Sequence, residues 1–387
     1  MYNVYLKKNE EKRLFKNESL IYANEVARIE GKGTNGSLAN VYSFDSKYIG
    51  KGYINHLSKV LVRILIRDDS IDDKEFFYKR IKEANDLRIE IGYTDSYRVV
   101  YSESDKLPGL IIDKYSNCLV VEISSLGMEL KKDIIIECLK EIFNPVCIYE
   151  KCEMNLRSKE GLKDSSGELY GKLPKDVIIC ENGLKMYVDI KDGQKTGYFL
   201  DQKENRLSIR TYTKDKDVLD CFSNTGGFSM NAALNSKSVT AVDISKKATD
   251  IVMKNAELNG FKNVSVITDD VFKVLRDFKK ENRLFDVIIL DPPAFTKSFS
   301  EVKDALKGYK DINILAMKLI RKGGYLITSS CSHYVTFNLF QKMLIESASE
   351  AHKFIRIIDF KTQAKDHPSI LSVNDTMYLK FYVLKIE

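Results

Sequence analysis

The chain lacks an uninterrupted apolar run of about 18 residues, the length that a membrane-spanning helix requires. Its first residues, MYNVYLKKNEEKRLF, also lack the apolar core of a secretion signal. These two absences predict a cytoplasmic protein that has no membrane partner.

Cysteine and histidine are both scarce and unfavourably spaced for structural sites. The seven cysteines are an odd number and form no CxxC pair, which argues against a disulfide framework and fits a reducing compartment. None of the four histidines has the spacing of a metal ligand, so we expect no bound metal. The six cysteines other than Cys331 are expected to pack in the interior.

The net charge of +6 is mildly basic for 387 residues. It is compatible with a polyanionic partner, but it lies below the usual charge of a dedicated nucleic-acid-binding domain. Charge alone therefore does not identify the partner.

The pattern of apolar residues divides the chain into three predicted domains. Residues 1–72 contain short β-branched and aromatic runs separated by glycines, which predicts a small β-barrel. Residues 73–182 begin with a helical pattern over 73–90, continue with strands and a helix near 129–143, and predict a small central α/β domain. The polar stretch 157–175 is expected to be a loop or hairpin.

Residues 183–387 alternate between strand-like and helix-like segments. We expect helices over 227–235, 246–258, 271–280, 301–320 and 336–350, each following a strand. This alternation is typical of a doubly wound α/β sheet with mainly parallel strands, a Rossmann-like fold. Ligands of such sheets bind at the carboxyl ends of the strands.

Three of these strand ends together predict a nucleoside pocket. DVLDCFSNTGGFS, residues 217–229, runs from a strand into a glycine turn where the backbone can approach a ligand. Asp243, about twenty residues later, is suited to accept hydrogen bonds from both ribose hydroxyls, and Asp270 from the amine of an adenine. The turn has neither GxGxxG nor a Walker lysine, so S-adenosylmethionine fits better than NAD. Both aspartates have a simpler alternative role as helix N-caps.

Two more strand ends carry the residues expected to act on a substrate. VIILDPPAF ends in a rigid proline loop that projects Asp291 toward the ligand edge, where Asp291 and Phe295 can hold a planar base. GGYLITSSCSHYV places Cys331 between serines at the end of the next strand, an unusual setting for a core cysteine.

FSNTGGFS, AVDIS, DDVF and DPPAF, in this order, resemble class I S-adenosylmethionine-dependent methyltransferases. GQKTGYFLDQKENR at 193–206, ESDKLPGLIIDKY at 103–115 and SSCS extend the resemblance to the bacterial 23S ribosomal RNA cytosine-5 methyltransferase family, over nearly the whole chain. The resemblance implies a PUA domain at 1–72, a central domain at 73–182 and a methyltransferase domain at 183–387. It also implies 23S ribosomal RNA, naked or in an assembly intermediate, as the substrate; a homodimer is left open.

The resemblance assigns roles to residues of this sequence. Catalysis is predicted for Cys331 and Asp291, and substrate binding for Pro292, Pro293 and Phe295. The predicted cofactor-binding residues are Phe222, Ser223, Asn224, Thr225, Gly226, Gly227, Asp243, Ile244, Asp270, Val271, Asp201 and Gln202. Asp201 and Gln202 have an alternative role as caps of the helix that follows.

Formation of 5-methylcytosine requires a nucleophile such as Cys331, because carbon-5 of cytosine reacts only after a thiolate adds to carbon-6. Related RNA enzymes often have a second cysteine after the proline loop, but DPPAF has none, so the residue that removes the carbon-5 proton is not identified. Two alternatives remain open: a guanine-N7 methyltransferase, which needs no thiol, and a ribosome-assembly factor that binds S-adenosylmethionine without catalysis. Adenine-N6 methylation is less favoured, because those enzymes lack a partner cysteine.

Overall fold

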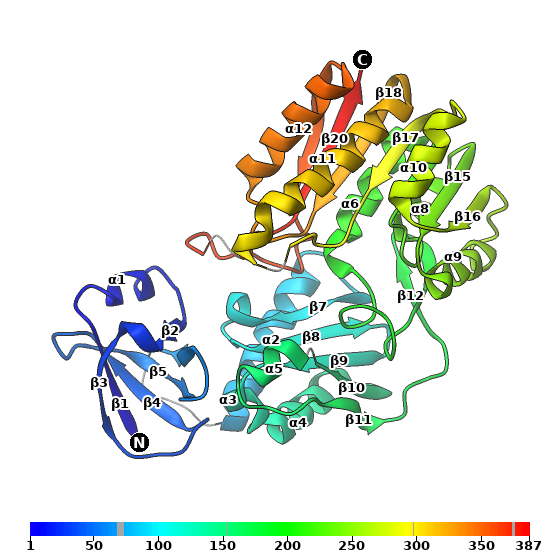
Figure 1. Ribbon diagram of the computed structural model, residues 1–387. Coiled ribbons are helices and arrows are strands. Elements are labelled where there is room, and N and C mark those ends of the chain that lie inside the picture. The colour runs from blue at the N-terminus through cyan, green and yellow to red at the C-terminus, as the bar shows by residue number, and fades with distance from the viewer. Residues whose placement is uncertain (68–72, 153, 297, 374–375) are drawn as a thin grey trace. The chain divides into compact units, whose positions relative to one another are not determined.

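A computed structural model describes residues 1–387 except 68–72, 153, 297 and 374–375. The described chain forms two compact units (Figure 1). The first unit comprises residues 1–179, 188–200 and 365–376, and the second comprises 180–187, 201–364 and 377–387. The predicted division into three domains at residues 72 and 182 remains a prediction.

The amino-terminal part of the first unit is rich in strands, as the sequence predicts. Its six-stranded sheet has the order β2-β6-β5-β4-β1-β3. β1 pairs in parallel with β4 and antiparallel with β3. A small apolar core that includes Val4, Val41 and Val62 fills its interior. The strands are β1 (Tyr2–Leu6), β2 (Leu20–Tyr22), β3 (Val26–Gly31), β4 (Leu38–Tyr42), β5 (Tyr48–Ile54) and β6 (Val60–Ile66), with the short helix α1 (Glu11–Leu14).

The rest of the first unit is built on a five-stranded sheet of order β11-β10-β9-β8-β7. The helix predicted over 73–90 is observed over the same residues. The helix predicted near 129–143 is instead two helices, and the predicted hairpin region contains a strand that pairs antiparallel with β10. The elements are α2 (Asp73–Glu90), β7 (Ser96–Tyr101), β8 (Leu110–Tyr115), β9 (Cys118–Ile123), α3 (Leu126–Glu129), α4 (Lys132–Phe143), β10 (Cys147–Lys151), α5 (Met154–Ser158) and β11 (Ser166–Gly171).

The second unit contains a seven-stranded sheet of order β16-β15-β14-β17-β18-β20-β19. The first five strands of this order are parallel, and β20 is antiparallel to both of its neighbours. The strands are β14 (Asp217–Cys221), β15 (Ser238–Asp243), β16 (Val264–Thr268), β17 (Phe285–Leu290), β18 (Ile320–Ser330), β19 (Ile355–Lys361) and β20 (Lys380–Ile386). The hairpin β12 (Val177–Glu181) and β13 (Leu184–Val188) forms a separate two-stranded sheet.

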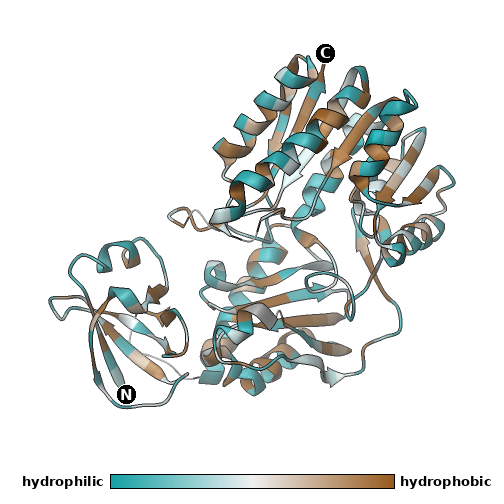
Figure 2. Cartoon of the chain, in the orientation of Figure 1, coloured by the Kyte–Doolittle hydropathy of each residue, from teal (hydrophilic) through white to brown (hydrophobic). Residues whose placement is uncertain are grey.

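Helices cover both faces of this sheet, which makes it a doubly wound fold. Buried residues of α10, α11 and α12 form one large apolar core with the strands, and α8 contributes to the core on the other face. Figure 2 shows the strands as mainly hydrophobic and the helices as amphipathic. The helices are α6 (Lys203–Ser208), α7 (Arg210–Thr213), α8 (Gly227–Ala233), α9 (Lys246–Leu258), α10 (Val271–Lys280), α11 (Val302–Leu319) and α12 (Phe337–Ala351).

The strand order reverses between β14 and β17, because the chain first builds β15 and β16 on one side and then crosses to the other. This is the switch point where open α/β sheets bind ligands. The segments after β14, β15, β16, β17 and β18 all leave from the same edge. β20 begins at this edge, since Lys380 pairs with Ser330, the last residue of β18.

In the part of the chain that the structure describes, no helix combines the length and the hydrophobicity needed to cross a membrane.

Candidate active site

The turn after β14 is tight, and backbone hydrogen bonds and left-handed backbone angles define its shape. Phe222, Asn224 and Gly226 have φ values of 61°, 47° and 85°, all in the left-handed region. The amide of Ser223 donates to the carbonyl oxygen of Val242 at 3.0 Å, and the amide of Gly226 donates to that of Ser223 at 2.8 Å. A Cβ atom at position 226 would lie 3.1 Å from the Val252 side chain. Glycine is therefore favoured both by the positive φ value and by the little room for a side chain.

The Ser223 side chain is evidence that a ligand binds at this turn. Its hydroxyl oxygen is buried and has no hydrogen-bond partner among the described residues. A buried hydroxyl without a partner is costly, so the polar groups of a bound molecule would satisfy it. Thr225 is also buried, and its carbonyl oxygen accepts from the side-chain amide of Asn255 at 2.8 Å.

The carboxylate of Asp243 holds two backbone segments together. Its Oδ2 accepts from the amide of Asn224 at 2.9 Å, and its Oδ1 accepts from the amide of Ser245 at 2.9 Å. Each carboxylate oxygen has capacity for a second hydrogen bond, which suits a ribose diol. The next side chain, Ile244, is 72% exposed and offers an apolar surface beside that carboxylate.

Asp270 is the N-cap of α10, since its Oδ1 accepts from the amide of Lys273 at 2.9 Å. Its neighbour Asp269 forms an ion pair with the Lys273 ammonium at 2.6 Å. The alternative role of Asp270 as a helix cap is therefore observed. Its role toward an adenine remains a prediction, as does that of the buried Val271.

Asp291 follows β17, and two polar side chains fix its orientation. Gln202 donates from Nε2 to Asp291 Oδ1 at 2.8 Å, and the Ser329 hydroxyl donates to the same oxygen. Asn205 in turn donates to the Gln202 side chain at 2.7 Å. The carboxylate is therefore held by a chain of hydrogen bonds that begins on α6.

The loop after Asp291 is partly packed into the core. Pro292 is buried, whereas Pro293 is exposed. The Phe295 ring is half-buried and lies 4.6 Å from the ring of Tyr309 on α11. Phe295 thus helps to fix the loop, and stacking of this ring on a base remains a prediction.

Asp201 and Gln202 are both buried, at 2% and 3% exposure. The Tyr378 hydroxyl donates to Asp201 Oδ2 at 2.6 Å, and the amide of Ala364 donates to the Asp201 carbonyl oxygen at 2.8 Å. Gln202 occupies the N-cap position of α6, but its side chain makes no capping hydrogen bond. The hydrogen bonds of Gln202 therefore position Asp291, a role that the sequence did not indicate.

Sequence reasoning also missed Asp220, which lies inside β14 and is completely buried. Ser229 donates to its Oδ2 at 2.6 Å, while its Oδ1 has no hydrogen-bond partner among the described residues. Burial is the main cause that raises the pKa of Asp220 to about 7; the nearby carboxylates of Asp291 and Asp243 act in the same direction, and the hydrogen bond from Ser229 acts against them. A carboxylate within an apolar strand, VLDCF, was the signal that could have indicated it.

Cys331 directly follows β18, and its side chain is half-buried. β18 pairs with β17, which ends immediately before Asp291, so the two predicted catalytic residues follow neighbouring strands at one edge of the sheet. Cys221 is completely buried, and burial raises the pKa of its thiol well above the usual value. The expectation that all the other cysteines pack in the interior is wrong for Cys180, which is exposed.

Among the described residues, no group of three or more histidine, cysteine, aspartate or glutamate side chains is arranged to hold a metal ion.

Comparison with known families identifies the cofactor. A family model described as S-adenosylmethionine-dependent methyltransferase matches residues 155–382, and a model for a PUA-like domain matches residues 4–67. A curated relative from Klebsiella pneumoniae (strain 342), named ribosomal RNA large subunit methyltransferase I, is 39% identical over 98% of this chain and 97% of its own. The chain belongs to this methyltransferase family.

Other comparisons agree with this family. A methyltransferase of the same name from Vibrio cholerae is 39% identical over 99% of both chains. A solved structure described as a SAM-dependent methyltransferase from Streptococcus mutans aligns over the whole length of both chains with a TM-score of 0.84. At 22% sequence identity, this structural likeness shows a shared fold. The predicted fold class and the predicted methyl donor, S-adenosylmethionine, are therefore confirmed for this methyltransferase.

Proposed function

We propose that this methyltransferase forms 5-methylcytosine in 23S ribosomal RNA through a covalent adduct with Cys331. One observation carries the proposal: Cys331 and Asp291 follow two neighbouring parallel strands, at the edge of the sheet where most of the predicted cofactor residues also lie. The names of the curated relatives support a large-subunit ribosomal RNA substrate. Such a substrate supports the proposal of a cytoplasmic enzyme.

The residues at this edge fit S-adenosylmethionine, which supplies an electrophilic methyl group when bound. Asp243 would accept from the ribose hydroxyls, and Ile244 would cover one face of the adenine. The backbone of residues 222–227 would surround the methionine part, with the Ser223 hydroxyl as a partner for its polar groups. The cofactor carries a sulfonium and an ammonium group, and the carboxylates of Asp243 and Asp291 would favour that positive charge electrostatically.

Cys331 would begin the reaction as a thiolate. Its sulfur forms a bond to carbon-6 of the cytosine, and the electrons of the 5,6-double bond move to carbon-5, which takes the methyl group. Loss of the carbon-5 proton restores the double bond and breaks the bond between sulfur and carbon-6. The proline loop contains no second cysteine, so the group that accepts this proton remains unassigned.

Asp291 would hold the base during these steps. Gln202 and Ser329 fix its carboxylate, so it can accept a hydrogen bond from the exocyclic amine of the cytosine with little loss of entropy. Asp291 does not activate the thiol, because a nearby carboxylate disfavours a thiolate.

The target cytosine must leave its stack before carbon-6 can reach the sulfur, which costs a few kcal/mol. Naked 23S ribosomal RNA or an assembly intermediate lowers this cost, since fewer contacts hold the base. The match of residues 4–67 to a PUA-like domain supports an RNA substrate.

Release of tritium from RNA labelled at carbon-5 of cytosine tests the proposed function. The purified enzyme with S-adenosylmethionine should release one tritium for every methyl group transferred, because the carbon-5 hydrogen is replaced. Methyl transfer without tritium release would contradict the proposal and indicate another acceptor, such as guanine N7. Binding of S-adenosylmethionine without any methyl transfer to ribosomal RNA would indicate an assembly factor.

Replacing Asp243 with alanine should weaken S-adenosylmethionine binding about 10- to 100-fold, because a charged acceptor contributes about 1.5–3 kcal/mol. The loss of its hydrogen bonds to Asn224 and Ser245 would also loosen the turn. Calorimetric titration measures the affinity. Asp250→Ala is a matched control, since this aspartate pairs with Lys246 at the surface of α9. Equal affinity in the two variants would contradict a ribose-binding role for Asp243.

A further inference from the structure

Lys380 is a buried lysine at the reaction edge to which no role has been assigned. It is the first residue of β20 and pairs with Ser330, immediately before Cys331. Its side chain is 1% exposed. The ammonium nitrogen donates to the carbonyl oxygens of Ser332 at 2.6 Å and Tyr378 at 2.7 Å, which aim it at the segment that contains Cys331.

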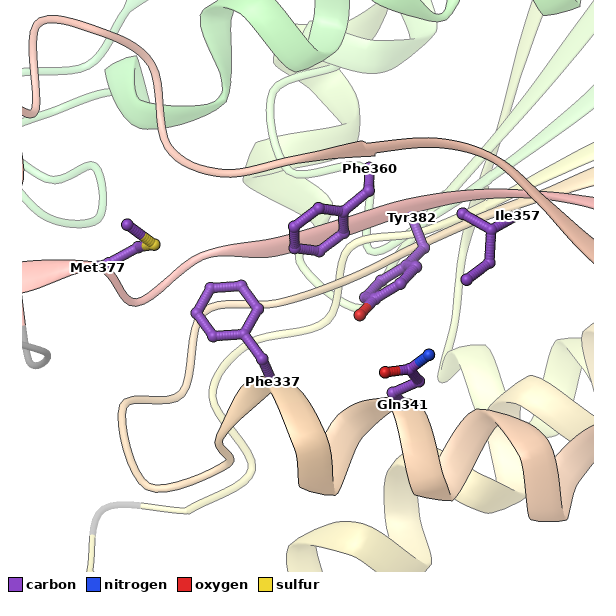
Figure 3. A pocket seen from close by; sticks show the side chains of 6 residues that line it. All are labelled: Phe337, Gln341, Ile357, Phe360, Met377 and Tyr382. Carbon is purple, nitrogen blue, oxygen red and sulfur yellow. The ribbon is translucent and has the colours of Figure 1, made fainter.

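Lys380 forms no ion pair with a carboxylate in the described part of the chain. On another side it faces the ring of Phe337, 5.8 Å from the ring centre. That ring belongs to an apolar groove (Figure 3), which offers no counter-charge. The groove is lined by Phe337, Gln341, Ile357, Phe360, Met377 and Tyr382. A buried ammonium is costly unless an anion stabilises it.

The anion that this position offers is the Cys331 thiolate. Burial lowers the pKa of Lys380 to about 8, and the negative charge of Cys331 acts in the opposite direction and raises it. Cys331 also raises the pKa of Tyr309, whose phenol accepts a hydrogen bond from Ser330 at 3.1 Å. Cys331 thus raises the pKa values of two groups, Lys380 and Tyr309. Of these two, Lys380 is the one that can carry a positive charge.

Among the described residues, the other titratable groups at this corner include Tyr309, His333 and Asp291. Burial keeps Tyr309 neutral by raising its pKa. His333 stacks on the Tyr378 ring with 5.0 Å between the ring centres, and the Tyr378 hydroxyl donates to Asp201. Asp291 contributes a negative charge, which opposes a thiolate.

We propose that Lys380 is the positioning residue that keeps Cys331 in its thiolate form. The neutral amine of Lys380 takes the thiol proton, and the resulting ammonium forms an ion pair with the sulfur. When the sulfur bonds to carbon-6, the ammonium of Lys380 no longer has the thiolate as its counter-ion. The ion pair forms again when the adduct breaks. This inference rests on the proposed function, because it gives Cys331 the role of nucleophile.

The pH dependence of Cys331 alkylation by iodoacetamide tests this role without requiring turnover, because only the thiolate reacts. Mass spectrometry of the peptide that contains residue 331 follows this thiol separately from the exposed Cys180. In the wild-type chain the midpoint should lie below the value of about 8.5 that is usual for a free thiol. In Lys380→Met the midpoint should rise by about 1–3 units, which corresponds to at least about 10-fold slower alkylation near pH 7.

Two further variants separate charge from packing. Lys380→Arg retains the cation and should keep the midpoint near that of the wild type. Lys385→Met removes a lysine from the same strand that bonds to the Gly323 carbonyl oxygen, and should leave the midpoint unchanged. A purely structural role would change the maximal alkylation rate or the stability of Lys380→Met without moving the midpoint.

A wild-type midpoint of 8.5 or above would overturn the inference, even if Lys380→Met failed to fold. An unchanged midpoint in a folded Lys380→Met variant would also overturn it. Neither result affects the proposed function if Cys331→Ala is inactive. Full activity of Cys331→Ala would instead overturn the proposed function.

Discussion

Cys331→Ala should lose methyl transfer to ribosomal RNA by at least about 10⁴-fold, because removal of a covalent nucleophile leaves only substrate positioning. Cytosine is activated only by addition at carbon-6, and alanine cannot add. S-adenosylmethionine affinity should remain near that of the wild type, since none of the predicted cofactor residues lies in the segment after β18. Transfer of labelled methyl groups to 23S ribosomal RNA from a deletion strain measures the turnover.

The matched control is Cys180→Ala, which removes the exposed thiol and should keep full activity. Cys221 is unsuitable as a control because it is completely buried in β14 and its loss would create a cavity. Normal turnover by Cys331→Ala would exclude the covalent route and favour methylation of guanine N7. Loss of turnover together with loss of cofactor binding would point to a folding defect, which thermal unfolding would detect.

Asp220→Asn should remove a pH dependence from the stability of the second unit. The pKa of Asp220 is about 7 in the folded chain because of burial, well above about 4 for an aspartate in an unfolded chain. Between these values the folded state binds more protons than the unfolded state, so wild-type stability falls as the pH rises from about 4 to 7. Above about pH 7 the variant should be more stable than the wild type by on the order of 4 kcal/mol, since a pKa difference of about three units corresponds to about 1.4 kcal/mol for each unit.

Urea unfolding of both chains at a series of pH values between 5 and 8 measures this effect, without added cofactor. The difference in unfolding free energy should grow as the pH rises. Asp250→Asn is the control, because this carboxylate is 54% exposed and removal of its charge should cost little. Parallel pH profiles of the wild type and Asp220→Asn would show that Asp220 is not a buried, protonated carboxyl.

Local patterns were sufficient for the strands of the seven-stranded sheet and for helices α8 to α12, but not for the hairpin β12–β13 or for α6 and α7. The helices predicted over 246–258 and 271–280 are observed as Lys246–Leu258 and Val271–Lys280. Each begins at a side chain that caps it: the Ser245 hydroxyl accepts from the amide of Ala248, and Asp270 accepts from that of Lys273. Apolar periodicity and a capping residue act within a few positions, so the sequence alone contains both signals.

The helix predicted near 129–143 shows where local patterns were not sufficient. It is two helices, Leu126–Glu129 and Lys132–Phe143, although the apolar spacing continues through both. The amides of Ile135 and Lys131 bond to the carbonyl oxygens of Lys131 and Met128, respectively. The chain turns there because Met128, Ile135 and Leu139 are buried in one core, which the packing of the unit determines.

The sequence by itself determined the order of strands and helices, the glycine turn, the carboxylates at the strand ends, and the cysteine after TSS. Each of these depends on residues that are close together along the chain. Only the tertiary structure decided what surrounds Cys331 and Asp291. Gln202 contacts Asp291 across 89 positions, and Lys380 contacts the segment of Cys331 only because β20 pairs antiparallel with β18. The position of a buried charge relative to a nucleophile depends on this pairing, because burial and electrostatic interaction are properties of the folded chain.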